Sequence, residues 1–186
     1  YDDRPIPHID WESFYSVCAP KVLGAINLHM AILGKNVNSF CLVSSLAAML
    51  GNAGQCSYAA ANSFLDGLAH FRKSKGLVAA SVDFGPFEDF GFLADKPQVR
   101  GLISRMGTNF VPKHFALKAM ENALVMGLVQ VGVFDIDWQR WLSQMRFGEV
   151  PDKLKTIVAN LKENKDGAIS TRIDIFKELD LAAPSE

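Results

Sequence analysis

The sequence predicts an α/β fold in which helices cover both faces of a parallel β-sheet. Three short apolar runs have the length of strands, "SFCLVSS" at 39–45, "LVAASVDF" at 77–84 and "LVQVGVFDI" at 128–136, and helical patterns separate them. Their nearly continuous apolar character indicates burial on both sides, which is typical of parallel strands. The 186 residues are 49% hydrophobic and 21% charged, a composition that favours a protein with a core.

The first helix is expected to begin near Asp10 or Ser13, because either side chain can cap a helix. Apolar residues then recur at helical spacing from Phe14 onward, and Gly34 is expected to end the helix. Pro20 lies inside this pattern and predicts a break or two helices in tandem.

The later elements follow from the same kind of pattern. After strand 39–45 we expect a loop of small residues over 46–57 and then a long helix that ends at "KSKG". Its apolar stripe consists of Phe64, Leu65, Leu68 and Phe71. We expect the segment 88–108 to be loop-like with short helical pieces. Pro112 should open a helix through Ala123, and Asp137 should cap the short helix "WQRWLSQM".

The two ends of the chain have a different character. From Gly148 onward the mixed charges of "KENKDG" and the ending "APSE" predict a linker or poorly anchored tail, so the expected division is 1–147 and 148–186.

The start "YDDRP" has no methionine and suggests a piece of a longer protein. None of the 14 glycines falls in a GxGxxG spacing. If the chain belongs to a dinucleotide enzyme, the Gly-rich N-terminal half of that fold is absent from it.

The bulk properties exclude several classes of function. A net charge of −1 gives no electrostatic case for a nucleic acid or an anionic membrane as partner. The apolar runs are too short to span a bilayer and no signal peptide is visible, so we expect a cytoplasmic protein. The three cysteines (Cys18, Cys41 and Cys56) have no metal-ligand spacing, and we expect buried free thiols and no metal site.

The stretch "YAAANSFLDGLAHF", residues 58–71, carries candidate chemistry. Tyr58 and Asn62 are four residues apart and therefore lie on one helix face. Ser44 and Ser45 close the preceding strand, at the end where parallel sheets bind ligands. A serine hydroxyl and a phenol can together hold a carbonyl oxygen, provided that a cation helps the phenol to release its proton. Tyr58 resembles the acid–base tyrosine of short-chain dehydrogenases, most of which have a lysine where this chain has Asn62.

Three stretches, "APKVLGAINLH", "CLVSSLAAMLGNAGQCSYAAANSFLDGLAHFR" and "SVDFGPFEDFG", carry a more specific resemblance. From Tyr1 to about Leu142 the chain resembles the catalytic half of a polyketide synthase ketoreductase domain, a Rossmann-like fold of the short-chain dehydrogenase type. In that family the lysine lies on the preceding helix. The resemblance implies that Lys21 is the cation, Ser45 the catalytic serine (with Ser44 as the alternative) and Tyr58 the acid. Asn62 would position the lysine and a relay water.

The resemblance also implies binding residues. "FGPF" is similar to the loop that lines the nicotinamide pocket, so Gly85, Pro86 and Phe87 join Tyr58 and Lys21 as candidate NADPH contacts. The segment 88–108 would be a lid. Its apolar side chains, including Phe90 and Phe92, would either touch the substrate or serve simple packing.

Stereochemistry is implied by two positions. "YDD" places Asp3 at the last acid of a family motif that accompanies the D-3-hydroxyl (B-type) product, and Tyr1 departs from the usual aliphatic residue there. The tryptophan of the opposite type, expected eight residues before Tyr58, is replaced by Leu50. Gln55 is a further candidate for substrate contact.

The resulting expectation is NADPH-dependent reduction of a β-ketoacyl thioester to the 3-hydroxyacyl thioester. The expected partners are an acyl carrier protein with its phosphopantetheine-bound substrate, the N-terminal half of the ketoreductase domain and other synthase domains. Two alternatives stay open: a non-catalytic structural or interaction fragment of a megasynthase, or the ketoreductase of a fatty acid synthase.

Overall fold

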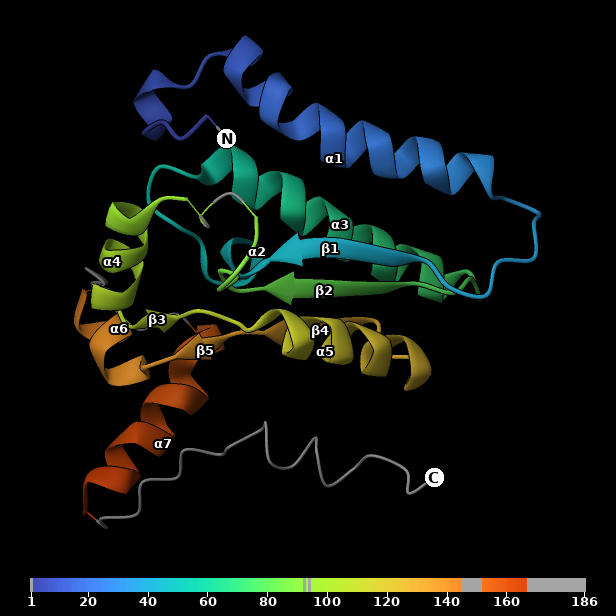
Figure 1. The fold of residues 1–186 in the computed structure, drawn as a ribbon. Coiled ribbons are helices and arrows are strands. Elements are labelled where there is room, and N and C mark those ends of the chain that lie inside the picture. Colours follow the sequence, from blue (N-terminus) through green and yellow to red (C-terminus); the bar gives the residue numbers. More distant parts are fainter. Residues whose placement is uncertain (1, 92, 94, 145–151, 167–186) are drawn as a thin grey trace.

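A parallel β-sheet forms the centre of the molecule (Figure 1). The structure is a computed structural model that describes residues 2–91, 93, 95–144 and 152–166. Strands β1 (Cys41–Ser45), β2 (Ala80–Phe84) and β4 (Gln130–Val133) lie in the order β1-β2-β4, and both neighbouring pairs are parallel. The three predicted strands and their parallel arrangement are thereby confirmed.

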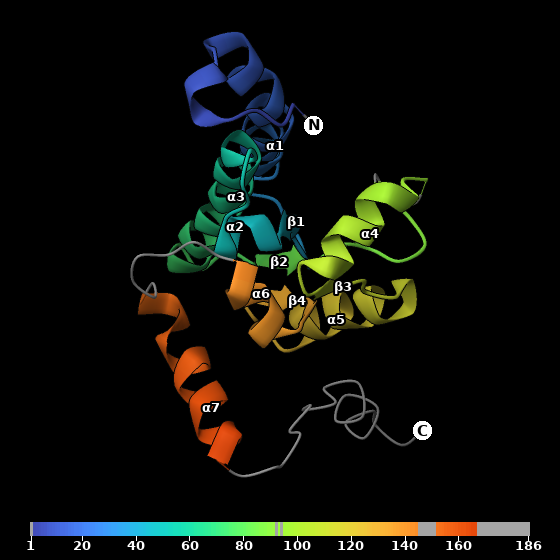
Figure 2. The ribbon, with the colours of Figure 1, turned by 90° about the vertical axis from the view of Figure 1, so that its left-hand side faces the viewer.

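Helices cover both faces of this sheet, as predicted (Figure 2). Helices α1 (Trp11–Ala31) and α3 (Cys56–Ser74) lie on one face, and α5 (Lys113–Val125) lies on the other. Val82 and Phe84 of β2 belong to the buried cluster under α5, whereas Leu42 of β1 packs with residues of α1 and α3. The alternation along β2 therefore turns its other side chains, Ser81 and Asp83, toward α3.

Helix α1 is continuous through Pro20, so the predicted break is wrong. Asp10 caps the helix, because its Oδ1 accepts a hydrogen bond from the Ser13 amide at 2.8 Å. Pro20 removes the donor that would bind the carbonyl of Ser16, and both residues are exposed. Water can hydrate that carbonyl, so the helix continues across the proline.

The connections from β1 to α2, from α2 to α3 and from α3 to β2 are short. Helix α2 (Leu46–Leu50) occupies the segment in which we expected a loop, and Ser45 is its N-cap. Gly76 follows α3 with φ of +71°, as a helix-ending glycine requires. Helix α4 (Pro97–Arg105) lies within the segment expected to contain short helical pieces.

The remaining described elements frame the C-terminal side of the sheet. Strands β3 (Thr108–Asn109) and β5 (Asp135–Ile136) pair in antiparallel fashion. Helix α6 (Trp138–Gln144) begins after Asp137, whose Oδ1 accepts a hydrogen bond from the Arg140 amide at 3.0 Å, as predicted. The short 3-10 helices are η1 (Ile6–His8) and η2 (Asp152–Leu154).

The predicted tail contains an ordered element. Helix α7 (Lys155–Asp166) follows η2, Leu154 is buried, and Lys153 donates to the carbonyl of Met49. This portion is therefore anchored to α2, unlike the poorly anchored tail that the composition suggested. The rest of the predicted tail, 148–151 and 167–186, lies outside the described residues. Within the described ranges, no helix is long and apolar enough to cross a membrane.

Candidate active site

Lys21, Ser45, Tyr58 and Asn62 come together at the carboxyl end of β1. Lys21 lies on α1, and Tyr58 lies in the first turns of α3. The Lys21 Nζ atom is 5.9 Å from the centre of the Tyr58 ring, and it donates a hydrogen bond to the carbonyl of Val43 at 2.9 Å. The packing of α1 on α3 thus brings a cation to the phenol from a distant part of the sequence.

The charge on Lys21 is subject to opposing influences. Burial lowers the pKa of Lys21 below its usual 10.5, because an ammonium group loses hydration there. The negative charges of an ionised Tyr58 and of Asp66 raise the same pKa. Burial outweighs these two charges, so the pKa of Lys21 lies below its usual value.

Asn62 is fixed beneath Tyr58. Its side chain is fully buried, and its Nδ2 donates to the Tyr58 carbonyl at 2.8 Å. Its Oδ1 is buried and has no hydrogen-bond partner within the described part of the chain. Because buried polar atoms are normally hydrogen-bonded, this oxygen is suited to accept a hydrogen bond from a water or a cation.

The two serines at the end of β1 have different environments. Ser45 is half-buried, and its Oγ accepts a hydrogen bond from the Ala47 amide at 3.2 Å, which leaves the hydroxyl proton able to donate. Ser44 is buried, and its Oγ donates to the carbonyl of Asn62 at 3.3 Å. This arrangement favours Ser45 over Ser44 as the hydroxyl that contacts a ligand.

The segment Gly85–Phe87 continues from β2 toward the same end of the sheet. Val111 anchors it on both sides, because its amide donates to the Pro86 carbonyl at 2.8 Å and its carbonyl accepts from the Glu88 amide at 3.0 Å. A Cβ at Gly85 would lie 2.9 Å from the Cβ of Phe134. Packing against Phe134 therefore favours a glycine at this position, in addition to the NADPH contact that the resemblance implies.

One aromatic candidate of the expected lid, Phe90, packs on this loop. The Phe87 ring lies 5.1 Å from that of Phe84 and stacks on that of Phe90, with 4.1 Å between the ring centres. Phe90 thus has a packing role against Phe87. Phe92 lies outside the described residues.

Two of the candidate stereocontrol residues are in contact. The Gln55 Nε2 donates to Asp3 Oδ2 at 2.8 Å, although 52 residues separate them. Gln55 is the N-cap residue of α3, and Leu50 is the last residue of α2. The N-terminal segment is therefore held at the entrance to the helix that carries Tyr58.

Comparisons with known proteins agree with this fold. The family model of the KR domain matches residues 1–89. The chain is 30% identical to the highly reducing polyketide synthase GPY1 of Gibberella fujikuroi over 92% of this chain and 8% of that protein. It is 39% identical to polyketide synthase GfsA of Streptomyces halstedii over 75% of this chain and 2% of that protein.

Solved structures give the same result. The A-type ketoreductases of a modular polyketide synthase match with a TM-score of 0.79 and 29% identity over 84% of this chain and 33% of that one. The first ketoreductase of the tylosin synthase matches with a TM-score of 0.71 and 34% identity over 84% of this chain and 36% of that one. This chain belongs to the ketoreductase domains of polyketide synthases. It spans about a third of these solved ketoreductases and less than a tenth of the curated synthases.

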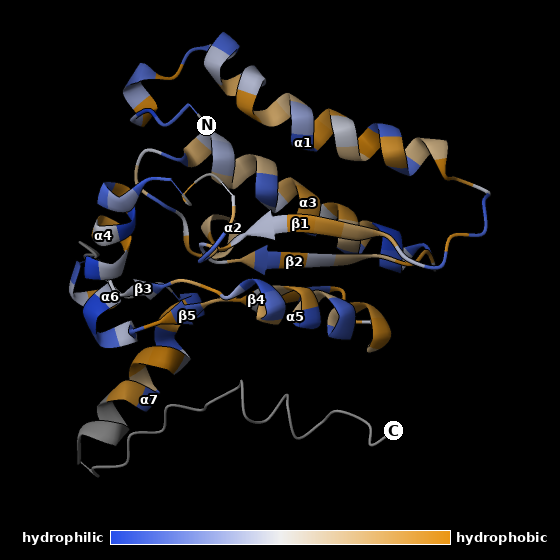
Figure 3. Ribbon diagram, viewed as in Figure 1, coloured by the Kyte–Doolittle hydropathy of each residue, from blue (hydrophilic) through white to orange (hydrophobic). Residues whose placement is uncertain are grey.

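This ketoreductase chain also has a buried acidic cluster that the sequence analysis missed. Ser81 Oγ donates to Asp66 Oδ1 at 2.6 Å, and Gln130 Nε2 donates to Asp83 Oδ2 at 2.8 Å. Burial raises the pKa of Asp83 to about 6 and nearby Asp66 adds to the rise, while hydrogen bonds from Gln130 and Ser44 oppose it. The available signal was an aspartate inside the apolar strand "SVDF", and Figure 3 shows the hydrophilic carboxyl end of β2.

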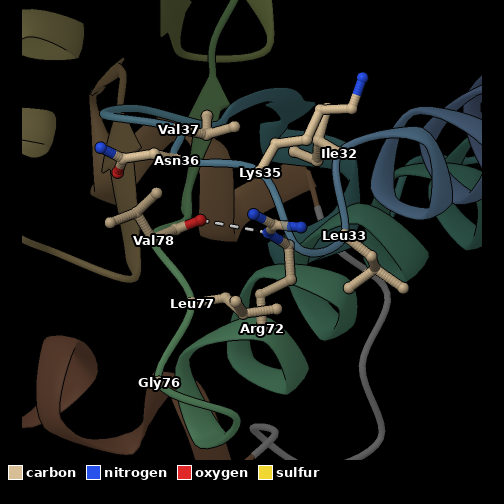
Figure 4. A pocket seen from close by; sticks show the side chains of 9 residues that line it. All are labelled: Ile32, Leu33, Lys35, Asn36, Val37, Arg72, Gly76, Leu77 and Val78. Carbon is tan, nitrogen blue, oxygen red and sulfur yellow. Dashed lines mark hydrogen bonds between the residues drawn. The ribbon is translucent and has the colours of Figure 1, made fainter.

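A cavity of about 230 Å³ lies at the opposite end of the ketoreductase sheet (Figure 4). It is lined by Arg72 and by the loops that precede β1 and β2, including Lys35 and Val78. The Arg72 Nε donates to the Val78 carbonyl at 3.1 Å. Because the cavity lies at the amino ends of the strands, it is separate from the site at Tyr58.

Proposed function

We propose that this chain is the catalytic half of an NADPH-dependent β-ketoacyl reductase, which reduces a β-ketoacyl thioester on an acyl carrier protein to the 3-hydroxyacyl thioester. The observation that carries the proposal is the separation of 5.9 Å between Lys21 Nζ and the centre of the Tyr58 ring. A cation beside a phenol at the carboxyl end of a parallel strand suits proton donation to a carbonyl oxygen.

The residues around Tyr58 fit a nicotinamide nucleotide. A lysine has three donors, and Lys21 makes one hydrogen bond in the described part of the chain, to a main-chain carbonyl. The remaining donors suit the ribose hydroxyls, and Lys21, Tyr58 and the segment 85–87 would hold the nucleotide. When bound, NADPH supplies the hydride that the β-carbon of the substrate accepts.

The chain's own residues supply the proton and stabilise the oxygen. Tyr58 donates its phenolic proton to the developing alkoxide, and the Ser45 hydroxyl donates a hydrogen bond to the same oxygen. The charge of Lys21 stabilises the tyrosinate that remains. The Oδ1 of Asn62, for which the described residues supply no hydrogen-bond partner, accepts a hydrogen bond from the water that returns the proton. General acid catalysis of this kind contributes about 10²–10⁴-fold.

The sheet supports the N-terminal half of the domain as the partner. In the described part of the chain β1 is an edge strand, and Val43 on it is 49% exposed. Open strand edges favour pairing with a further strand. Such a strand would lie beside Lys21, which already donates to the Val43 carbonyl. The other synthase domains and the carrier-bound phosphopantetheine arm complete the proposed assembly.

The proposed product is the D-3-hydroxyacyl thioester. Asp3, the acid of the family motif for this outcome, is held by Gln55 beside the start of α3, and Leu50 stands where the opposite type has tryptophan. A bias of about 1.4 kcal/mol between the two faces gives tenfold selectivity, so one or two contacts suffice. Chiral chromatography of the product from a β-ketoacyl-N-acetylcysteamine thioester tests this, and a predominantly L product would contradict it.

The function itself is tested with the complete ketoreductase domain that contains this chain. We expect that domain to oxidise NADPH in step with formation of a 3-hydroxyacyl thioester from the same surrogate, and to prefer NADPH over NADH. Nicotinamide fluorescence measures binding separately. A folded domain that binds NADPH but forms no hydroxyacyl product would favour the non-catalytic alternative.

A further inference from the structure

Helix α4, in the segment expected to form a lid, has no buried residue. It lies at the carboxyl end of the sheet (Figure 1), and Val99 and Leu102 on it are 40% and 52% exposed. A helix without a buried apolar face gains little from hydrophobic packing, so contacts of single side chains with neighbouring segments matter more. Arg100, which is half-buried, makes such contacts.

The side chain of Arg100 reaches two consecutive main-chain carbonyls of the loop after β2. Its Nη1 donates to the Glu88 carbonyl at 2.6 Å and, more weakly, to the Phe87 carbonyl at 3.4 Å. The guanidinium also lies over the ring of Phe110, with 4.1 Å between Cζ and the ring centre. A planar guanidinium can donate at its edge and stack with its face at the same time, which the ammonium of a lysine cannot do.

The same loop is held by Val111, the neighbour of Phe110. The Val111 amide donates to the Pro86 carbonyl at 2.8 Å, and its carbonyl accepts from the Glu88 amide at 3.0 Å. Arg100 adds bonds from α4 to the carbonyls of residues 87 and 88. The main chain of residues 86–88 is thus fixed by contacts with two other segments, in a loop that contains the candidate NADPH contacts.

We propose that Arg100 is a positioning residue for the NADPH site: by binding the carbonyls of Phe87 and Glu88 from α4, it holds the loop 85–88 in one conformation. A loop that is already ordered does not have to be ordered by the nucleotide, which favours binding. This role rests on the proposed function. The order of the loop can nevertheless be measured without any nucleotide.

The test variant is Arg100→Met, which keeps much of the aliphatic length and removes the donors and the charge. We expect the NADPH dissociation constant of the complete domain to rise about tenfold, as when binding must order about one further residue. Turnover at saturating NADPH should stay near the parental value, because the groups that move the proton are untouched. Nicotinamide fluorescence and steady-state kinetics measure the two quantities.

Arg105→Met is the matched control. Arg105 lies on the same helix and is exposed, and its Nε donates to the Gly101 carbonyl of that helix at 3.2 Å. The substitution therefore removes an equal charge from α4 without touching the loop. We expect the parental dissociation constant for NADPH in this variant.

The direct measurement is hydrogen exchange of the Glu88 and Val111 amides, followed by NMR in the complete domain without nucleotide. Both amides should exchange faster in Arg100→Met than in the parent and in Arg105→Met. The amides of β2 should keep their parental protection, which separates local loosening from global unfolding. Unchanged exchange at Glu88 and Val111 in a folded Arg100→Met domain would overturn the proposal. Faster exchange with an unchanged NADPH dissociation constant would also overturn it, because the contact would then be structural only.

Arg100→Lys keeps the proposal testable if Arg100→Met does not fold. A lysine can donate to one of the two carbonyls but cannot reproduce the stacking on Phe110, so the dissociation constant should rise less, in the same direction. A parental value in that variant would count against the proposal. If the parent domain does not bind NADPH, the proposed function fails, and the exchange rates alone then decide whether Arg100 holds the loop.

Discussion

Two cations lie at opposite ends of the same sheet, Arg72 buried and Lys21 half-buried, and their surroundings differ. Arg72, at the amino ends of the strands, is 2% exposed. It donates to the Val78 carbonyl, its Nη1 lies 2.7 Å from His29 Nδ1, and it stacks at 4.1 Å over the ring of Phe40. Lys21, at the carboxyl ends, makes one hydrogen bond in the described part of the chain and stands beside a phenol.

We propose that this difference separates a structural cation, Arg72, from a functional one, Lys21. The guanidinium of Arg72 contacts the Val78 carbonyl in the loop before β2 and His29 on α1, and its flat face lies over Phe40. These contacts compensate for the cost of burying its charge. Among the described residues the Lys21 ammonium donates to one main-chain carbonyl and keeps further donors, and burial lowers its pKa. Sites that retain such uncompensated groups are typical of catalysis. The two cations should therefore respond oppositely to mutation.

The largest effect is expected at the partner of Lys21. Tyr58→Phe removes the proton donor and little surface, so turnover of the complete domain should fall by about 10²–10⁴-fold. NADPH binding and the free energy of unfolding should stay near those of the parent. Single-turnover rates and nicotinamide fluorescence measure the two properties. Near-parental turnover would show that another group is the acid.

The comparison of the two cations predicts that substitution of Arg72, at the amino ends of the strands, lowers the stability of the protein. Arg72→Met removes the hydrogen bonds to the Val78 carbonyl and His29, and it should lower the free energy of unfolding by about 2–4 kcal/mol. Turnover per folded molecule should not change. Lys21→Met, the matched variant at the site, should cost less than about 1 kcal/mol of stability. Urea unfolding of both variants measures this, and equal losses would remove the distinction between the two cations.

A smaller effect is expected from the acid behind the site. The pKa of Asp83 in the folded protein is about 6, above its usual 3.8. Its contribution to the free energy of unfolding is therefore fully present below pH 3.8. That contribution is lost as the pH rises through about 6, and the loss amounts to about 2–3 kcal/mol. Asp83→Asn should flatten the pH dependence of urea unfolding between pH 4 and 8. A variant that keeps the parental slope would show that Asp83 does not cause it.

Much of the fold could be predicted because the strands are continuous apolar runs separated by helical patterns. The apolar runs 39–45, 77–84 and 128–136 gave a clear signal, and β1, β2 and β4 lie within them, although only β2 is buried along its whole length. Pro20 misled the prediction, because whether a proline breaks a helix depends on the exposure of the carbonyl it leaves unpaired. That exposure is a property of the tertiary structure.

Less of the candidate site than of the fold could be predicted from the sequence. Local spacing indicated Tyr58 and Asn62, and the end of a strand indicated Ser45. Lys21 was indicated by family resemblance alone. The contact of Gln55 with Asp3 and the pairing of Ser81 with Asp66 depend on which residues the fold brings together. No local pattern specifies such pairs, so the acidic cluster was found only in the structure.

The central claim is that Lys21 supplies the charge that many short-chain dehydrogenases place four residues after the tyrosine. It is tested most directly by exchanging the two residues and measuring turnover in the complete domain. Lys21→Asn alone should lose at least about 100-fold, because the tyrosinate loses its cation. The double variant with Asn62→Lys should recover part of that loss. A Lys21→Asn domain that reduces the surrogate at the parental rate would contradict the claim.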